Sequence, residues 1–309
     1  EKGDVQIIRK AFVMAVDAHG SMRRKSGEPY IYHPIAVARI VAEEIGLGTT
    51  AIVCALLHDV VEDTDITLEE IQQAFDPKVA NIIDGLTKIS GVYDTSSPQA
   101  ENFRKMLLTM ADDVRVILIK LCDRLHNMRT LEHMSDRGQL KIASETSFIY
   151  APLAHRLGLY AIKTELEDLS LKYTQPALYQ DLKYKLNASK EQRNRYIRSF
   201  IKPIKVELDE LGVDYEIKGR PKSIHSIYTK MVNKKLEFED VYDLFAIRII
   251  LDSEPEDEKM DCWNVYSIIT SIFKPNPERM RDWISIPKSN GYESLHSTVM
   301  GPKGQWVEV

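Results

Sequence analysis

Apolar residues recur at intervals of three and four positions through most of the first 170 residues of the chain. Such spacing places the apolar side chains on one face of a helix. The predicted helices cover residues 5–19, 35–45, 49–63, 67–75, 76–90, 111–131 and 161–173. Thr67 and Asp76 stand where helix caps are expected, and Pro77 falls in a first turn. We therefore expect the first half of the chain to be all-α.

Two segments interrupt or alter this helical pattern. Residues 90–102 are polar and contain a proline, which predicts a flexible loop close to a functional site. Pro176 breaks the pattern again, and residues 175–212 have the composition of a charged, helical connector.

The pattern changes at about residue 213. Residues 213–220 alternate like a strand, and residues 241–252 form an apolar, β-branched run typical of a buried central strand. Helical spacing returns at 223–235 and 261–273, and residues 295–309 predict a hairpin that turns at Pro302 to Gly304. This order indicates an α+β fold with a mixed sheet. The predicted organisation is an all-α domain at 1–170, a helical connector at 171–212 and an α+β domain at 213–309.

The composition is that of an ordinary soluble globular protein, with 309 residues of which 44% are hydrophobic. The net charge of -5 offers no global attraction to nucleic acid or membrane, so any basic site must be local. Cys54, Cys122 and Cys262 are far apart in apolar segments, which predicts buried free thiols in a reducing compartment and not a disulfide frame or a zinc site.

The same reasoning predicts a cytoplasmic location. No stretch approaches the ~20 apolar residues that a membrane helix requires, and no signal peptide opens the chain. The first residue is not methionine and the last residues have the pattern of a strand, so we expect the chain to be a fragment of a longer protein.

Four ionisable residues follow directly on the apolar run 51–57. On a continuous helix with His58 at zero, Asp59 falls at about 100°, Glu62 at about 40° and Asp63 at about 140°. All four polar groups would then share one face, opposite a face suited to the core. A solvated helix end or an i,i+4 pairing face is the ordinary alternative for such a segment.

Two further segments carry the same residue types. Asp123, His126 and Asn127 stand at i, i+3 and i+4 behind an apolar run, and His33 follows a basic turn. A buried Asp123 would be costly without a partner cation, which favours a functional site over a solvated helix end. The set of two imidazoles and two carboxylates formed by His33, His58, Asp59 and Asp123 suits manganese, iron or zinc.

The segments "RRKSGEPYIYHP", "HDVVEDT" and "LCDRLHNMRTL" resemble the HD-type hydrolase domain of the long Rel/SpoT proteins, which make and destroy the alarmone (p)ppGpp of the stringent response. The resemblance spans the helical half. It implies Mn²⁺ held by His33, His58, Asp59 and Asp123, with Glu62 and Asp63 as the acid/base and water-orienting pair. It also implies substrate contacts from Arg24, Lys25, Ser26, Asn127 and Thr130. The implied reaction is attack of metal-activated water on the 3′-pyrophosphate, which gives GDP or GTP plus pyrophosphate.

The second half contains a local basic site. Residues 217–235 hold six Lys or Arg and no Asp or Glu, and "GRPKS" leads from a predicted strand into a predicted helix, an arrangement that suits phosphate. A solvated basic helix face is the ordinary alternative. Asp243 and Arg248 stand five residues apart in the apolar run, and so on opposite faces. Glu308 would complete a Mg²⁺-holding pair with Asp243 if their strands are neighbours.

The motifs "GRPKS", "SIY-K", "YDL-A-R" and "PK-NGY-SLH" resemble the synthetase domain of the same family. The implied reaction transfers pyrophosphate from ATP to the 3′-hydroxyl of GDP or GTP. The resemblance implies Mg²⁺ held by Asp243 and Glu308, with Glu308 also able to deprotonate the 3′-hydroxyl. It further implies nucleotide contacts from Arg220, Lys222, Ser226, Lys230, Arg248, Lys288, Asn290, Tyr292 and His296, with Tyr292 stacked on guanine.

Two departures from the family pattern are visible in the synthetase half. Glu293 stands where the family usually has Gln, beside the expected base site. The chain also ends one residue past Glu308, where the family pattern continues, so we expect the synthetase domain to be incomplete here.

We interpret the chain as the catalytic N-terminal half of a bifunctional (p)ppGpp synthetase/hydrolase that acts on ppGpp or pppGpp, GDP or GTP, and ATP. Ribosome and tRNA binding is expected only through C-terminal regions outside this chain. We further hypothesise that the connector lets each site sense the occupancy of the other. One alternative is a hydrolase whose second half is a regulatory nucleotide-binding domain. Another is a nucleotide- or RNA-binding module, whose binding would depend on salt and not on metal.

Overall fold

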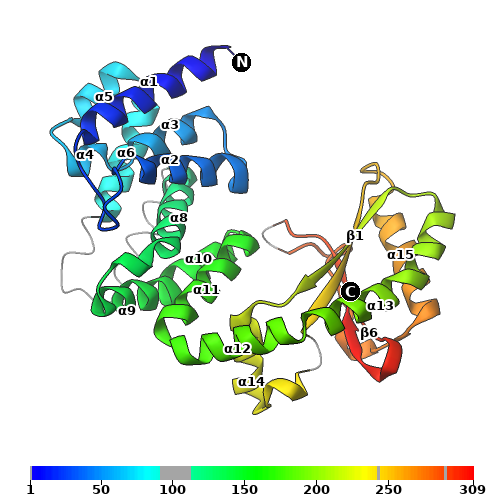
Figure 1. Cartoon of the computed structure of the whole chain (residues 1–309). Coiled ribbons are helices and arrows are strands. Elements are labelled where there is room, and N and C mark those ends of the chain that lie inside the picture. Colours follow the sequence, from blue (N-terminus) through cyan, green and yellow to red (C-terminus); the bar gives the residue numbers. More distant parts are fainter. Residues whose placement is uncertain (1, 91–112, 242–243, 289–290) are drawn as a thin grey trace. The chain divides into compact units, whose positions relative to one another are not determined.

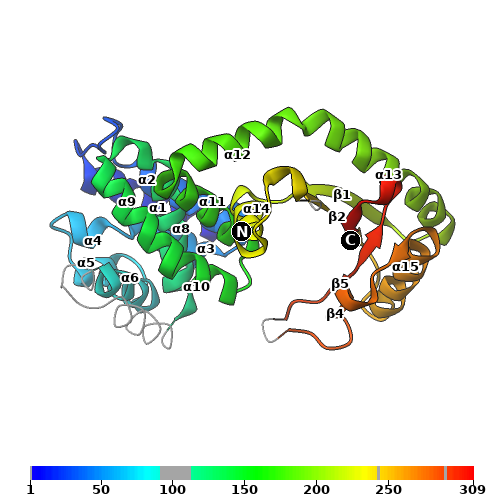
Figure 2. The ribbon, with the colours of Figure 1, turned by 90° about the horizontal axis from the view of Figure 1, so that it is seen from below.

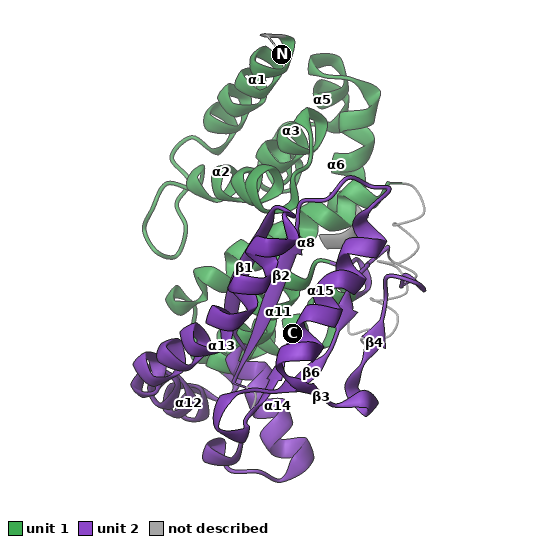
Figure 3. Ribbon diagram, turned by 90° about the vertical axis from the view of Figure 1, so that its right-hand side faces the viewer, with its two compact units in different colours: residues 1–155, 159–173 green, residues 156–158, 174–309 purple. Residues whose placement is uncertain are grey.

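The computed structural model describes residues 2–90, 113–241, 244–288 and 291–309 (Figure 1). The chain divides into two compact units, which Figure 3 distinguishes by colour. Unit 1 comprises residues 1–155 and 159–173, and unit 2 comprises residues 156–158 and 174–309. Among the described residues, none of the helices combines the length and apolar character that crossing a bilayer requires.

The described elements of unit 1 are all helices, as the spacing of apolar residues predicts. They are α1 (Lys2–His19), α2 (Tyr32–Arg39), the π-helix η1 (Ile40–Ile45), α3 (Thr49–Leu57), α4 (Val60–Asp63), α5 (Leu68–Ala74), α6 (Pro77–Ser90), α8 (Val114–Arg129), the 3₁₀ helix η3 (Leu131–His133), α9 (Asp136–Glu145), the π-helix η4 (Thr146–Tyr150), α10 (Ala151–Arg156) and α11 (Tyr160–Thr174).

The predicted helix starts at Thr67 and Asp76 are confirmed. Thr67 forms a capping box with Glu70 before α5, and the Asp76 carboxylate accepts a hydrogen bond from the backbone N–H of Val79 at the start of α6. The predicted loop at 90–102 lies, from residue 91 onward, outside the described residues.

The core of unit 1 forms where α2, α3, α6 and α8 pack against one another. Val53 and Leu57 of α3 and Ile117 and Leu125 of α8 are completely buried. The cysteines are free thiols, as predicted; Cys54 and Cys122 are buried with their helices, whereas Cys262 is partly exposed. Because α3 and α8 both lie in the core, polar residues at their ends are fixed by rigid elements.

Unit 2 contains two long helices and then alternating strands and helices. Its described elements are α12 (Pro176–Ala188), α13 (Lys190–Leu211), β1 (Tyr215–Pro221), α14 (Ile224–Lys234), η5 (Phe238–Asp240), β2 (Phe245–Leu251), α15 (Glu258–Ile272), β3 (Lys274–Pro275), η6 (Pro277–Arg279), β4 (Arg281–Asp282), β5 (Leu295–His296), β6 (Thr298–Met300), η7 (Pro302–Gly304) and β7 (Trp306–Glu308). Helices α12 and α13 occupy the segment expected to be a connector.

The predicted mixed sheet is confirmed. Five strands pair in the order β1-β2-β7-β6-β3, and β4 and β5 form a separate two-stranded ribbon. Strands β2 and β7 run parallel, whereas the other described pairs are antiparallel. The predicted hairpin is β6 and β7, joined through Pro302 to Gly304.

One face of this sheet is covered by α13 and α15 (Figure 2). Phe200 and Ile204 of α13 are completely buried in a cluster that includes Ile247 of β2 and Val307 of β7. The prediction of a buried central strand is therefore only half right. Strand β2 does lie between two neighbours, but Arg248 is exposed, because α13 and α15 pack on the opposite face, which includes Ile247.

Candidate functional site

The helix predicted over 49–63 is not continuous, and its interruption shapes the site. Helix α3 ends at Leu57, His58 and Asp59 form a turn, and α4 begins at Val60. Successive residues of an unbroken helix diverge by about 100°. The turn instead brings His58 Nε2 to 3.1 Å from Asp59 Oδ2, with both residues buried. Two adjacent side chains therefore point to one place.

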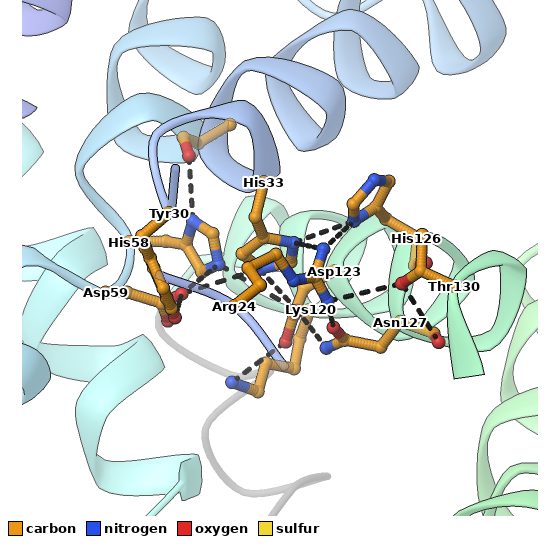
Figure 4. Close-up of polar contacts among 11 residues, drawn as sticks. Arg24, Tyr30, His33, His58, Asp59, Lys120, Asp123, His126, Asn127 and Thr130 are labelled. Carbon is orange, nitrogen blue, oxygen red and sulfur yellow. Dashed lines mark hydrogen bonds and ion pairs between the residues drawn. The ribbon is translucent and has the colours of Figure 1, made fainter. Parts of the chain in front are cut away.

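Four donor atoms from three helical regions converge at this place (Figure 4). His33 Nε2, from α2, lies 3.4 Å from Asp59 Oδ2 and 3.2 Å from Asp123 Oδ1 of α8. His58 Nε2 lies 3.9 Å from the same Asp123 oxygen. Two donors bound to one ion at ordinary metal–ligand lengths of about 2.0–2.2 Å lie about 3 Å apart. The ligand atoms of His33, His58 and Asp59 lie close enough together to hold one divalent metal ion, and Asp123 Oδ1 lies beside both imidazoles of this group.

The hydrogen bonding of His58 supports this fit. Its Nδ1 lies 2.8 Å from the carbonyl oxygen of Ala55, and a carbonyl can only accept, so Nδ1 carries a proton. Its Nε2 is buried and has no hydrogen-bond partner among the described residues. Asp59 Oδ2 is near but outside hydrogen-bonding geometry. In the neutral ring, Nε2 therefore presents a lone pair toward carboxylates, an arrangement that a shared cation stabilises.

The charges of the cluster are strongly coupled. Burial lowers the pKa of His58, but the negative charges of Asp59, which lies closest to the ring, and of Asp123 outweigh burial and raise it to about 9. Burial opposes ionisation of both carboxyl groups, yet His58 and His33 hold the pKa of Asp59 well below its usual range, and Lys120, His33 and His58 do the same for the pKa of Asp123. The site therefore attracts positive charge, for which a proton and a metal ion compete.

Arg24 organises one side of the cluster. It lies in a tight loop in which its backbone N–H donates to Glu28 and Gly27 adopts a φ of 88°, in the left-handed region. Its guanidinium donates to Asn127 Oδ1 at 3.0 Å and to Thr130 Oγ1 at 3.2 Å. Three residues expected to bind substrate are thus brought together.

The other two substrate residues predicted from the same motif lie in this loop. Lys25 is exposed, and the hydroxyl of Ser26 donates to Glu28 at 3.3 Å. Lys25 and Ser26 are the two residues that follow Arg24 in the chain, and their proposed contacts with substrate stay predictions.

Glu62 and Asp63 lie at the exposed edge of the cluster, on α4. The hydroxyl of Tyr30 donates to Asp59 Oδ2 at 2.7 Å. Burial first, then the charge and hydrogen bond of Asp59, and finally those of Asp63 raise the pKa of Tyr30. The charge of Glu62 likewise contributes to raising the pKa of Lys120. Both carboxylates are therefore close to the buried cluster and remain accessible to solvent.

In unit 2, the open face of the sheet gathers a second set of predicted residues. Strand β2 is the parallel neighbour of β7, with Ala246 beside Glu308. The predicted Mg²⁺ pair of Asp243 and Glu308 required the strands in these two segments to be neighbours, and β2 and β7 are. Arg220 of β1 pairs with Ala246, and Arg248 follows two residues later on the same face. Because side chains alternate along strands, Arg220, Arg248 and Glu308 all belong to the face opposite the helices.

Glu308 is the centre of a polar chain on this face. Its Oε2 accepts from Lys222 Nζ at 2.7 Å, and its Oε1 lies 3.8 Å from His296 Nδ1. The hydroxyl of Tyr292 lies 3.0 Å from His296 Nε2. The contact with His296, together with the hydrogen bond and charge of Lys222, outweighs burial and lowers the pKa of Glu308 to about 2. A carboxylate of this kind is a good cation ligand and a weak base.

Other predicted residues of this half lie in neighbouring elements. Ser226 is in the first turn of α14, which Ser223 caps, and Lys230 lies one turn further along. Lys288 places its ammonium 5.2 Å from the ring centroid of Tyr292. Asp243 and Asn290 lie outside the described residues, so their proposed roles stay predictions.

Comparisons with known proteins agree with both halves of this picture. Residues 11–160 match the HD domain family, and residues 219–309 match the region found in RelA and SpoT proteins. The chain is 46% identical over 311 positions to a GTP pyrophosphokinase of Myxococcus xanthus, covering 99% of this chain and 40% of that protein. It is 43% identical over 307 positions to the bifunctional (p)ppGpp synthase/hydrolase SpoT of Escherichia coli K12, covering 99% of this chain and 43% of SpoT.

The chain belongs to the RelA/SpoT family. It spans about two fifths of the length of these relatives. The resemblance of the two groups of motifs to this family is thereby confirmed, and so is the combination of an all-α HD domain with an α+β region.

Several residues of this RelA/SpoT chain reach the clusters without having been assigned a role from the sequence. In unit 1 they are Tyr30, Lys120 and His126. His126 Nδ1 lies 2.8 Å from His33 Nδ1 and 3.0 Å from the Arg24 guanidinium. Burial, followed by the charges of His33 and Arg24, lowers the pKa of His126 to about 3, so the neutral ring can accept a hydrogen bond.

In unit 2, Trp283 was missed. Its ring centroid lies 4.8 Å from the ammonium of Lys288, which therefore contacts both Trp283 and Tyr292. A signal for His126 was present in the sequence, one turn after Asp123. The sequence analysis found no such signal for Trp283, which follows β4 directly in the chain.

Proposed function

We propose that unit 1 hydrolyses the 3′-pyrophosphate of (p)ppGpp to GDP or GTP plus pyrophosphate, with Mn²⁺ held by His33, His58, Asp59 and Asp123. The observation that carries this proposal is the buried Nε2 of His58, which has no hydrogen-bond partner among the described residues and lies beside two carboxylates. The names of the relatives, which include 3′-pyrophosphohydrolases of guanosine bis(diphosphate), supply the substrate.

Each residue then has a specific task. When bound, a divalent ion lowers the pKa of a coordinated water by several units and polarises a phosphoryl oxygen. Asp63, close to Tyr30 and Asp59, orients the attacking water, and Glu62 exchanges a proton with the reacting groups. Arg24 holds Asn127 and Thr130 at the nucleotide, and the exposed Lys25 and neighbouring Ser26 contact phosphate.

Unit 2 is proposed to transfer pyrophosphate from ATP to the 3′-hydroxyl of GDP or GTP. Glu308 would hold Mg²⁺ together with Asp243, and its low pKa favours this task over that of a general base. Arg220, Lys222 and Lys230 would bind the phosphates of ATP, Ser226 and Arg248 would line the same face, and Lys288, Asn290, Tyr292 and His296 would surround the acceptor nucleotide.

The test of the hydrolase is release of pyrophosphate from ppGpp by the purified chain. We expect release in the presence of Mn²⁺, its loss after a chelator is added and its recovery when Mn²⁺ is restored, with GDP as the nucleotide product. Release that persists in chelator, or none from a folded chain loaded with Mn²⁺, would refute the proposal. If ppGpp bound with an affinity that fell steeply with salt concentration and did not depend on metal, the alternative of a nucleotide- or RNA-binding module would be favoured.

A further inference from the structure

Lys120 is a buried lysine at the metal cluster with no assigned task. Only 11% of its side chain is exposed, and it lies in α8 among apolar neighbours such as Ile117 and Leu121. An ammonium group loses hydration when it is buried, and a core position is usually filled by an apolar side chain. Packing therefore does not explain why a cation stands at this position, so the explanation must come from the polar contacts of Lys120.

Lys120 forms an ion pair with Asp123, one turn further along the same helix. Lys120 Nζ lies 3.2 Å from Asp123 Oδ2. The other oxygen, Oδ1, accepts from the side-chain amide of Asn127 at 2.6 Å and is the oxygen nearest to His33 Nε2 and His58 Nε2. The two oxygens thus have separate partners, and the ion pair on Oδ2 acts together with the Asn127 bond on Oδ1 to turn Oδ1 toward the histidines.

We propose that Lys120 is a positioning residue that holds Asp123 Oδ2, so that Oδ1 alone faces the divalent ion. This inference rests on the metal site of the proposed function. A carboxylate without this restraint can rotate and offer either oxygen, at a cost in ordering when the ion binds. Partners that orient metal ligands commonly change metal affinity by about 10- to 100-fold.

The direction in which metal affinity changes when Lys120 is replaced distinguishes a positioning role from a purely electrostatic one. A lysine that acted only as a nearby positive charge would repel the ion, so its removal would strengthen binding. A lysine that orients a ligand would have the opposite effect, because its removal frees Asp123 to rotate. The affinity for metal in the absence of substrate therefore decides between the two.

The experiment measures the Kd for Mn²⁺ by isothermal titration calorimetry, with Mn²⁺ titrated into the chelator-treated chain. Lys120→Met, which keeps the length and apolar stem, is expected to raise Kd by about 10-fold or more, in the range typical of ligand-orienting residues. Lys120→Arg, which keeps a cationic donor, is expected to recover much of the lost affinity. Lys141→Met removes an equal charge from an exposed position of α9 and should leave Kd unchanged.

An unchanged or lower Kd in Lys120→Met would overturn the inference. Circular dichroism in chelator checks that each variant is folded, and Lys120→Gln makes the same comparison if Lys120→Met is not. A wild-type chain that binds Mn²⁺ but leaves ppGpp intact would refute the proposed hydrolase. The role of Lys120 could still be tested by comparing the Kd for Mn²⁺ of the wild type and Lys120→Met. A wild-type chain that binds no Mn²⁺ would overturn both.

Discussion

Replacing Glu62 by Gln, or Asp63 by Asn, is expected to lower kcat for ppGpp hydrolysis by about 10²- to 10⁴-fold, the range usual for loss of a general acid or base. Both carboxylates lie on α4 at the exposed edge of the buried cluster, and Asp63 is close enough to affect Tyr30. Neither belongs to the four proposed ligands. The affinity for Mn²⁺, measured by calorimetry, should therefore stay close to that of the wild type.

A matched control is Glu69→Gln, which makes the same change in the exposed first turn of α5. We expect it to hydrolyse ppGpp at the wild-type rate. If the Glu62 and Asp63 variants were as active as this control, proton transfer would have to be assigned elsewhere. If they instead lost Mn²⁺ binding together with activity, the two residues would be metal ligands and not an acid/base pair.

Replacing Glu308 by Gln is expected to slow pyrophosphate transfer from ATP to GDP by about 10²-fold or more, because several kcal/mol of charge stabilisation depend on a properly held metal ion. The change removes the carboxylate that Lys222 and His296 contact and leaves the backbone pairing of β7 available. Since Glu308 belongs to unit 2, hydrolysis by unit 1 should be retained. Both activities can be followed with labelled nucleotides.

Glu278→Gln, in the exposed 3₁₀ helix η6, is the corresponding control and should transfer pyrophosphate normally. Transfer by Glu308→Gln at the wild-type rate would remove Glu308 from the proposed site. A wild-type chain that binds GDP and ATP, hydrolyses ppGpp and transfers no pyrophosphate would instead support the alternative in which unit 2 is a regulatory nucleotide-binding domain.

In unit 1, the local sequence predicted where helices lie better than it predicted the turns that join them. Helical periodicity predicts α5 and α6 with their caps, because Thr67 and Asp76 act on neighbouring backbone groups. Periodicity cannot predict the turn at His58 and Asp59, since these residues are compatible with a helix. Their convergence depends on His33 and Asp123, which reach the same point from other helices.

In unit 2, the pattern of apolar residues predicted β1, β2 and the hairpin of β6 and β7, but it missed the short strands β3 and β4, and the exposure of the strands depended on distant segments. Residues 241–252 look apolar enough for two covered faces, whereas α13 and α15 pack on the face that includes Ile247 and Arg248 on the other face is exposed. Which residues join Glu308 on the open face follows from the register with β1 and β2. Pairings between segments so far apart in the chain are set by tertiary packing, and one sequence carries little direct information about them.

The most direct test of the central claim follows Mn²⁺ binding and ppGpp hydrolysis in the same samples of wild type, His58→Ala and the exposed-residue control His133→Ala. We predict that hydrolysis by the wild type and the control rises with the fraction of chain that has bound one Mn²⁺. His58→Ala should stay folded and lose tight Mn²⁺ binding and hydrolysis together. Hydrolysis by His58→Ala at the rate of the control would contradict the account, because the buried cluster would then not be the site of the reaction.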